Sequence, residues 1–116
     1  SAWGGISGCQ TTARVLLAEG LTSKDLAFLC SVGPALRLGL PGGLLEPGAN
    51  ADLLLLDPAP EGTLAADELA YRHPYSPFVG RRLRGRIART LLRGRTVALD
   101  GQPVGEPLGR FVRPRA

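Results

Sequence analysis

The chain has 116 residues, with 14 Lys+Arg, 10 Asp+Glu, one His and two Cys, and its formal net charge is +4 at pH 7. This length fits one domain with its own hydrophobic core, and a composition of 44% hydrophobic and 21% charged residues excludes intrinsic disorder. No apolar run approaches the roughly 20 residues that cross a bilayer, so a membrane-spanning helix is excluded.

The first helix is predicted to begin near the N-terminus. Ser7 and Gln10 have the spacing of a capping box, in which each side chain bonds a backbone N–H of the other residue. Leu16 and Leu17 continue an apolar face at helical spacing, and Gly20 is a typical stop signal. We therefore expect one amphipathic helix between the box and Gly20.

A second helix is predicted after a second capping box, formed by Thr22 and Asp25. Gly33 followed by proline is expected to end this helix. A short helical turn over residues 34–38 follows, and Gly39 closes it. The first third of the chain is therefore predicted to contain three helical pieces.

From Pro41 onward, short apolar runs alternate with Gly and Pro, a pattern typical of strands joined by turns. Residues 53–56, four consecutive leucines, predict a central strand buried on both faces. Residues 87–92 and 96–99 predict a hairpin, and Asp100 with its following glycine predicts the next turn. Helices followed by strands indicate an α+β fold, with about four strands and a sheet that looks incomplete.

The two cysteines, Cys9 and Cys30, lie in apolar, helix-like stretches and are predicted to be buried free thiols in a reducing compartment. The N-terminus shows no basic region followed by an apolar stretch, so we predict no signal peptide and a cytoplasmic location. The chain contains no methionine, and its composition alone leaves open whether it is a truncated piece or has lost an initiator residue before Ser1.

Eight of the arginines fall between Arg72 and Arg95, a span without any acidic residue. Such a stripe could contact phosphates, but no aromatic side chains alternate with it as base stacking would require. Over residues 82–87 the charges recur with a period of two, as on the solvent face of a strand. Phosphate or nucleic-acid binding is therefore the weaker interpretation.

The sequence shows no residue pattern typical of a metal centre or of a catalytic residue. His73 has no His, Cys or carboxylate partner at a metal-binding spacing and no nucleophile pattern, so we interpret it as a structural histidine of its loop. The glycine-rich residues 3–8 are more informative, because they let backbone approach a ligand closely ahead of a helix. An ordinary glycine-rich turn explains them equally well.

Four segments together resemble the allantoinases, cyclic amidohydrolases of the amidohydrolase superfamily. Residues 1–10 resemble the segment after the eighth barrel strand, and residues 43–57 resemble the Pro-Gly and Ala-Asp pattern that leads into the superfamily's small β-sandwich. Residues 71–73 (Tyr-Arg-His) with 76–81 resemble the allantoinase and dihydroorotase tail, and residues 91–101 resemble its closing hairpin. The match runs nearly end to end.

The resemblance implies a (β/α)₈ barrel with its site at the C-terminal mouth, and a β-sandwich domain built from both chain ends. Residues 1–40 would then be the last barrel helices with a loop at the pocket edge, and residues 41–116 the C-terminal strands of the sandwich and a tail. A binuclear zinc centre is implied for the parent protein, but this chain has none of the family's ligands. The positions carried over are a substrate loop, formed by Gly4, Gly5, Ile6 and Ser7.

We therefore expect the C-terminal part of a hydrolase of purine catabolism that opens allantoin to allantoate and is catalytically incomplete without its parent. The expected partners are the missing N-terminal barrel and sandwich strands, a small cyclic amide substrate and further copies in a homo-oligomer, with no membrane. An alternative is a stand-alone, non-catalytic module that pairs its open strand edges with itself or with a partner.

Overall fold

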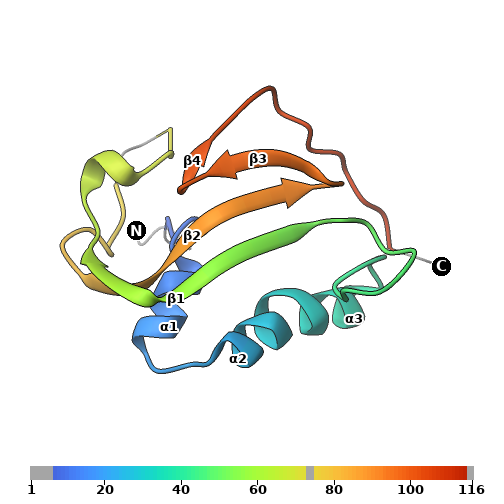
Figure 1. Ribbon diagram of the computed structural model, residues 1–116, viewed down its shortest axis with the longest axis horizontal. Helices are drawn as coiled ribbons and strands as arrows, with labels where there is room; N and C mark the ends of the chain where they lie inside the picture. The colour runs from blue at the N-terminus through green and yellow to red at the C-terminus, as the bar shows by residue number, and fades with distance from the viewer. Residues whose placement is uncertain (1–6, 73–74, 115–116) are drawn as a thin grey trace, which may run out of the picture.

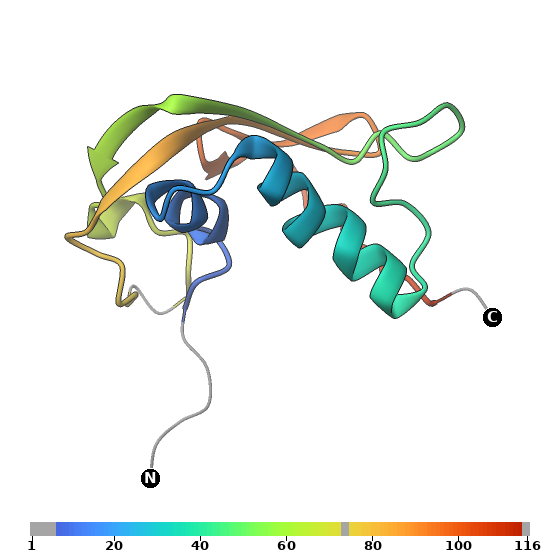
Figure 2. The same ribbon diagram turned by 90° about the horizontal axis from the view of Figure 1, so that it is seen from below.

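The computed structural model describes residues 7–72 and 75–114, and it arranges them in two layers. A four-stranded antiparallel sheet forms one layer, and the N-terminal helices cover one of its faces (Figures 1 and 2). The predicted α+β arrangement is confirmed at this level. The elements are α1 (Thr12–Ala18), α2 (Ser23–Ala27), η1 (Phe28–Val32), α3 (Gly33–Leu38), β1 (Leu53–Thr63), η2 (Ala66–Glu68), β2 (Arg82–Leu92), β3 (Arg95–Leu99) and β4 (Gln102–Pro103).

Helix α1 begins later than its sequence signal predicts. Its N-cap is Thr11, and the capping box predicted for Ser7 and Gln10 is wrong, because the Gln10 side chain bonds the distant backbone of Glu68 and Ala70 instead. The predicted end at Gly20 is confirmed. Gly20 has a φ of 92°, and backbone bonds from residues 20 and 21 back to residues 17 and 16 close the last turn.

The second helical region starts as predicted but ends later. The Asp25 N–H donates to Thr22 Oγ1 at 3.2 Å, and the Thr22 N–H donates to Asp25 Oδ2 at 2.8 Å. The prediction that the helix ends at Gly33 is wrong. Elements α2, η1 and α3 follow one another as one rod, and Gly39, with a φ of 62°, ends it as expected (Figure 2).

The helix continues through Pro34 because a wider, π-type turn precedes it. Proline lacks the N–H that an α-helix needs and its ring clashes with the carbonyl four residues earlier. In η1 the Gly33 N–H donates to the Phe28 carbonyl, five residues back, and this wider turn accommodates the ring. Pro34 therefore shifts the helical register by one residue instead of ending the helix.

The capping box predicts a pH dependence of stability. Hydrogen bonds from the Thr22 hydroxyl and the Thr22 N–H hold the pKa of the Asp25 carboxyl below its ordinary value. A pKa that folding lowers gives stability that is complete above the unfolded-state value and is lost as pH falls through the folded-state value. Urea unfolding should therefore show stability falling below about pH 4, and Asp25→Asn should reduce that fall. Asp67→Asn, the same change at another exposed residue, should leave it in place; equal pH profiles for both variants would contradict the prediction.

Both predicted hairpins are present in the sheet, whose strand order is β1-β2-β3-β4. Arg93 and Gly94 connect β2 to β3 with φ values of 49° and 77°, and Asp100 and Gly101 connect β3 to β4 with φ values of 47° and 80°. Two successive positive φ angles give the turn twist that fits a two-residue hairpin. Strand β2 joins the strand-like period of residues 82–87 and the predicted strand over residues 87–92 into one element.

Strand β1 corrects the prediction made for residues 53–56. Within the described residues it pairs only with β2 and lies at the end of the sheet, so it is not central. Leu54 and Leu55 are 50% and 46% exposed, and the expected burial on both faces is therefore wrong. Beyond Asp57 the pairing skips residues 58–60, where two prolines leave the ladder and the Ala59 N–H donates to Asp57 Oδ1 at 3.1 Å.

The core lies where α1 meets the start of β2. The buried apolar side chains are Leu17, Leu26, Leu64 and Leu83. A β-carbon at Gly85 would lie 2.5 Å from Leu17 Cδ1, so the helix packs directly on the glycine backbone. Cys9 and Cys30 are free, as expected, but the prediction that they are buried is wrong, because both are exposed and border an open cavity.

Candidate functional site

The candidate site begins where the predicted substrate loop enters the described part of the chain. Gly4, Gly5 and Ile6 lie outside the described residues. Ser7 is half-buried, and its carbonyl accepts a hydrogen bond from Ser76 Oγ at 2.8 Å. Ser76 is only 5% exposed, and its hydroxyl also accepts a long hydrogen bond of 3.4 Å from the Phe78 N–H.

Residues 8–12 connect Ser7 to the first helix by a turn centred on one carbonyl group. The Gly8 carbonyl accepts from the Thr11 N–H at 3.0 Å, from Thr11 Oγ1 at 3.1 Å and from Thr12 Oγ1 at 2.9 Å. Thr11 is 1% exposed, so its hydroxyl is satisfied within the turn. The turn therefore couples the end of the predicted loop rigidly to α1.

Gln10 joins this turn to the segment around η2. Its side-chain amide donates to the Glu68 carbonyl at 2.7 Å and accepts from the Ala70 N–H at 2.9 Å. Its backbone N–H donates to the Tyr71 hydroxyl at 2.8 Å. The glutamine thus pairs with the neighbouring backbone as another strand would, although the two segments are about 60 residues apart in sequence.

An ion pair lies on the other side of Gln10. Arg14 Nη1 is 3.2 Å from Glu68 Oε2, and the second oxygen of Glu68 accepts from the Ala65 N–H. Arg14 Nε is buried and has no hydrogen-bond partner among the described residues. Gln10, Arg14 and Glu68 line a cavity of about 650 Å³, together with residues of β1 and β2.

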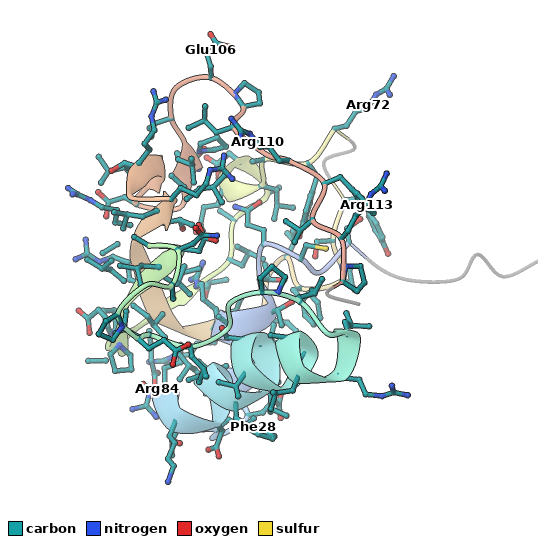
Figure 3. The ribbon with its side chains drawn as sticks, turned by 90° about the vertical axis from the view of Figure 1, so that its right-hand side faces the viewer. Phe28, Arg72, Arg84, Glu106, Arg110 and Arg113 are labelled. Atoms are coloured by element: carbon teal, nitrogen blue, oxygen red, sulfur yellow. The ribbon has the colours of Figure 1, made fainter. Side chains whose placement is uncertain are left out.

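Several arginines of the stripe contact other parts of the protein. As expected, arginines 82, 84 and 86 lie on the exposed side of β2, alternating with buried positions. Arg82 and Arg86 form ion pairs with Glu61 and Asp100, at 2.9 and 3.3 Å. Figure 3 shows Arg72 and Arg84 extending from opposite sides of the molecule, so the stripe does not gather on one face. This arrangement does not favour a phosphate-binding surface.

A metal centre is not formed by the described residues, because no three His, Cys, Asp or Glu side chains gather there as a metal ion would require. His73 lies outside them. None of the helices in residues 7–72 and 75–114 has the length and apolarity that a bilayer crossing needs.

Sequence reasoning missed the residues that organise this site. The sequence predicts a local cap for Gln10 and places Gln10, Tyr71 and Ser76 within segments that resemble the family, but it assigns none of them a contact with a distant part of the chain. The hydroxyl groups of Tyr71 and Ser76 contact backbone atoms more than 60 residues away, and such contacts leave no spacing pattern in a sequence. The glycine-rich residues 3–8 are the sequence feature that pointed to this part of the chain.

Comparisons with known proteins match almost the entire chain. A model of the amidohydrolase family matches residues 5–97. An allantoinase of Rubrobacter xylanophilus is 52% identical over 98% of this chain and 26% of its own length, and one of Deinococcus radiodurans is 41% identical over 100% and 27%. The solved L-hydantoinase (dihydropyrimidinase) of Arthrobacter aurescens has a TM-score of 0.84 and 31% identity over 97% of this chain and 27% of its own. The chain thus spans about a quarter of the length of these relatives.

Proposed function

Because the chain belongs to the amidohydrolase family, we propose that it is the C-terminal part of an allantoinase-like hydrolase that opens a cyclic amide or ureide ring. Allantoin, opened to allantoate, is the substrate that we propose. In this reaction the oxygen of water bonds to the ring carbonyl carbon, the C–N bond breaks and the ring nitrogen takes the proton. The observation that carries the proposal is the 52% identity to an allantoinase over 98% of the chain.

Residues 1–40 are proposed to supply the last barrel helices and the pocket-edge loop, and residues 41–116 the C-terminal strands of the β-sandwich and a tail. The exposed apolar side chains support a larger parent, because a chain of this size seldom leaves so many uncovered. On the helical rod, Phe28 and Leu36 are 58% and 73% exposed, and Figure 3 shows Phe28 at the periphery. The half-exposed leucines of β1 fit the same explanation.

Members of this family generally use metal ions, and a binuclear zinc centre is proposed for the parent. The described residues do not fit such a centre, because no cluster of ligands occurs among them. The role proposed for this chain is therefore to border the substrate through Gly4, Gly5, Ile6 and Ser7 and to cover the barrel. A cytoplasmic, homo-oligomeric parent that acts in purine catabolism completes the proposal.

The open edge of β1 would also suit the alternative of a stand-alone pairing module. The parent is favoured because each matched relative is about four times longer than the part that this chain covers. In the parent, further strands of the β-sandwich would occupy this edge.

The test is hydrolysis of allantoin by the protein encoded by the complete reading frame. We expect the purified parent with zinc to form allantoate, chelation to abolish the activity and zinc to restore it. The 116-residue chain alone is the control and should show no turnover above the blank. An upstream frame without a His-x-His pair, or a zinc-loaded parent inactive on allantoin, would contradict the proposal.

A further inference from the structure

The segment formed by residues 7–10 is held at both ends by one distant stretch of chain. Ser76 bonds the Ser7 carbonyl at one end, and Tyr71 bonds the Gln10 N–H at the other, both at 2.8 Å. We propose that Ser76 and Tyr71 are positioning residues that fix this segment, and with it Ser7 of the proposed substrate loop, beside the ring-opening site. This inference rests on the proposed function and adds to it the two residues that hold Ser7 and Gln10 in place.

The Ser76 hydroxyl has a defined direction. It accepts from the Phe78 N–H, so its own proton is free to point at the Ser7 carbonyl, and its burial keeps water from competing for that carbonyl. Ser7 is the member of the predicted loop that the structure describes. Ser76 therefore fixes the position of the Ser7 carbonyl.

At the other end of the segment, the Tyr71 hydroxyl oxygen accepts a hydrogen bond from the Gln10 N–H. The Gln10 N–H lies ahead of α1, where the first N–H groups lack partners within the helix, and the phenol oxygen satisfies it. The Gln10 side chain adds its two bonds to Glu68 and Ala70. Glu68, Ala70, Tyr71 and Ser76 thus hold residues 7–10 by four hydrogen bonds, and we call this set of bonds the loop clamp.

Two bonds of the loop clamp reach backbone atoms of Ser7 and Gln10, the other two join the Gln10 side chain to the backbone of Glu68 and Ala70, and none involves a buried leucine. The buried leucines lie elsewhere, so loss of one hydroxyl leaves the hydrophobic packing in place. A glycine-rich loop offers a ligand mainly backbone N–H and carbonyl groups, and these are useful only when they are held within a fraction of an ångström. The clamp supplies that restraint at Ser7, where the proposed loop enters the described residues.

The experiment uses the full-length protein with two substitutions and a matched control for each. Ser76→Ala and Tyr71→Phe each remove one clamp oxygen. Ser31→Ala removes a hydroxyl that also donates to a backbone carbonyl, that of Gly43 at 3.1 Å, but lies on the helical rod. Tyr75→Phe removes the hydroxyl of a tyrosine that is 72% exposed.

We expect each clamp variant to raise KM for allantoin about fivefold to tenfold, with kcat changed less than about twofold. Amide hydrogen exchange at residues 7–12 should become faster in both clamp variants, while Ser31→Ala and Tyr75→Phe leave exchange and kinetics unchanged. Because Tyr71→Phe keeps the ring, it decides the question even if Ser76→Ala fails to fold.

Unchanged exchange at residues 7–12 in Tyr71→Phe would overturn the clamp. Faster exchange with an unchanged KM, or a fall in kcat that only follows the folded fraction, would overturn its positioning role. If the wild-type parent turns over no cyclic amide, the proposed function fails and the positioning role fails with it. The exchange result alone then still shows whether the clamp holds residues 7–10.

Discussion

Replacing Gly85 with alanine is expected to lower the free energy of unfolding of the chain by about 3 kcal/mol. Gly85 has a φ of 85°, where an L side chain is strained, and its new β-carbon would lie 2.5 Å from Leu17 Cδ1 and 3.3 Å from the Asp57 carbonyl oxygen. Strain and overpacking therefore act together at the centre of the α1–β2 contact. Urea denaturation of the wild-type and variant chains measures the effect.

Gly80→Ala separates the two causes. Gly80 has a φ of 82°, close to that of Gly85, but its β-carbon would meet nothing within 4 Å. We expect it to cost about 1 kcal/mol, the strain alone. In the double variant Gly85→Ala/Leu17→Ala the contact with Leu17 Cδ1 is removed. Its loss of stability should therefore be smaller than the sum of the losses in Gly85→Ala and Leu17→Ala. Equal losses for Gly85→Ala and Gly80→Ala would contradict the packing argument.

Truncating Leu83 to alanine should cost about 3 kcal/mol, because Leu→Ala changes at fully buried positions leave a cavity that the surroundings fill only in part. Leu83 is 1% exposed and lies on the face of β2 that the helical layer covers. Urea denaturation again provides the measurement, with the midpoint and the slope both determined.

The matched control for Leu83 is Leu45→Ala. Leu45 is 87% exposed, so the same chemical change there should alter stability by less than about 0.5 kcal/mol. A loss at Leu45 as large as that at Leu83 would show that the assigned core is wrong. It would also indicate that the surface around Leu45 is covered in solution.

Features that depend on a few neighbouring residues could be predicted from the sequence. The Thr22 capping box, the helix ends at Gly20 and Gly39 and both hairpin turns are of this kind, because each is determined by local φ preferences and one or two short bonds. The same reasoning was wrong for Ser7 and Gln10. There, the backbone of residues 68–70 offers the Gln10 side chain a better partner than the local N–H, and no local pattern reveals that competitor.

Burial and the candidate site depend on the three-dimensional arrangement, and the sequence indicated less of them. Four leucines in succession predicted a two-sided strand, but burial requires surfaces on both sides, and β1 lies at an edge of the described sheet. The loop clamp depends on hydroxyl groups brought back from 60 to 70 residues away. The resemblance marked the right segments without giving the reason that they occur together.

The irregular stretch of β1 limits how the sheet can grow. Pro58 and Pro60 have no N–H, and the N–H of Ala59 is already bonded to Asp57, so residues 58–60 offer a neighbouring chain no free backbone donor. An added strand can therefore align continuously only along residues 53–57, before the prolines. Uncontrolled stacking of edges, the first step toward insoluble aggregates, is interrupted in the middle of an 11-residue strand by three residues of its own sequence.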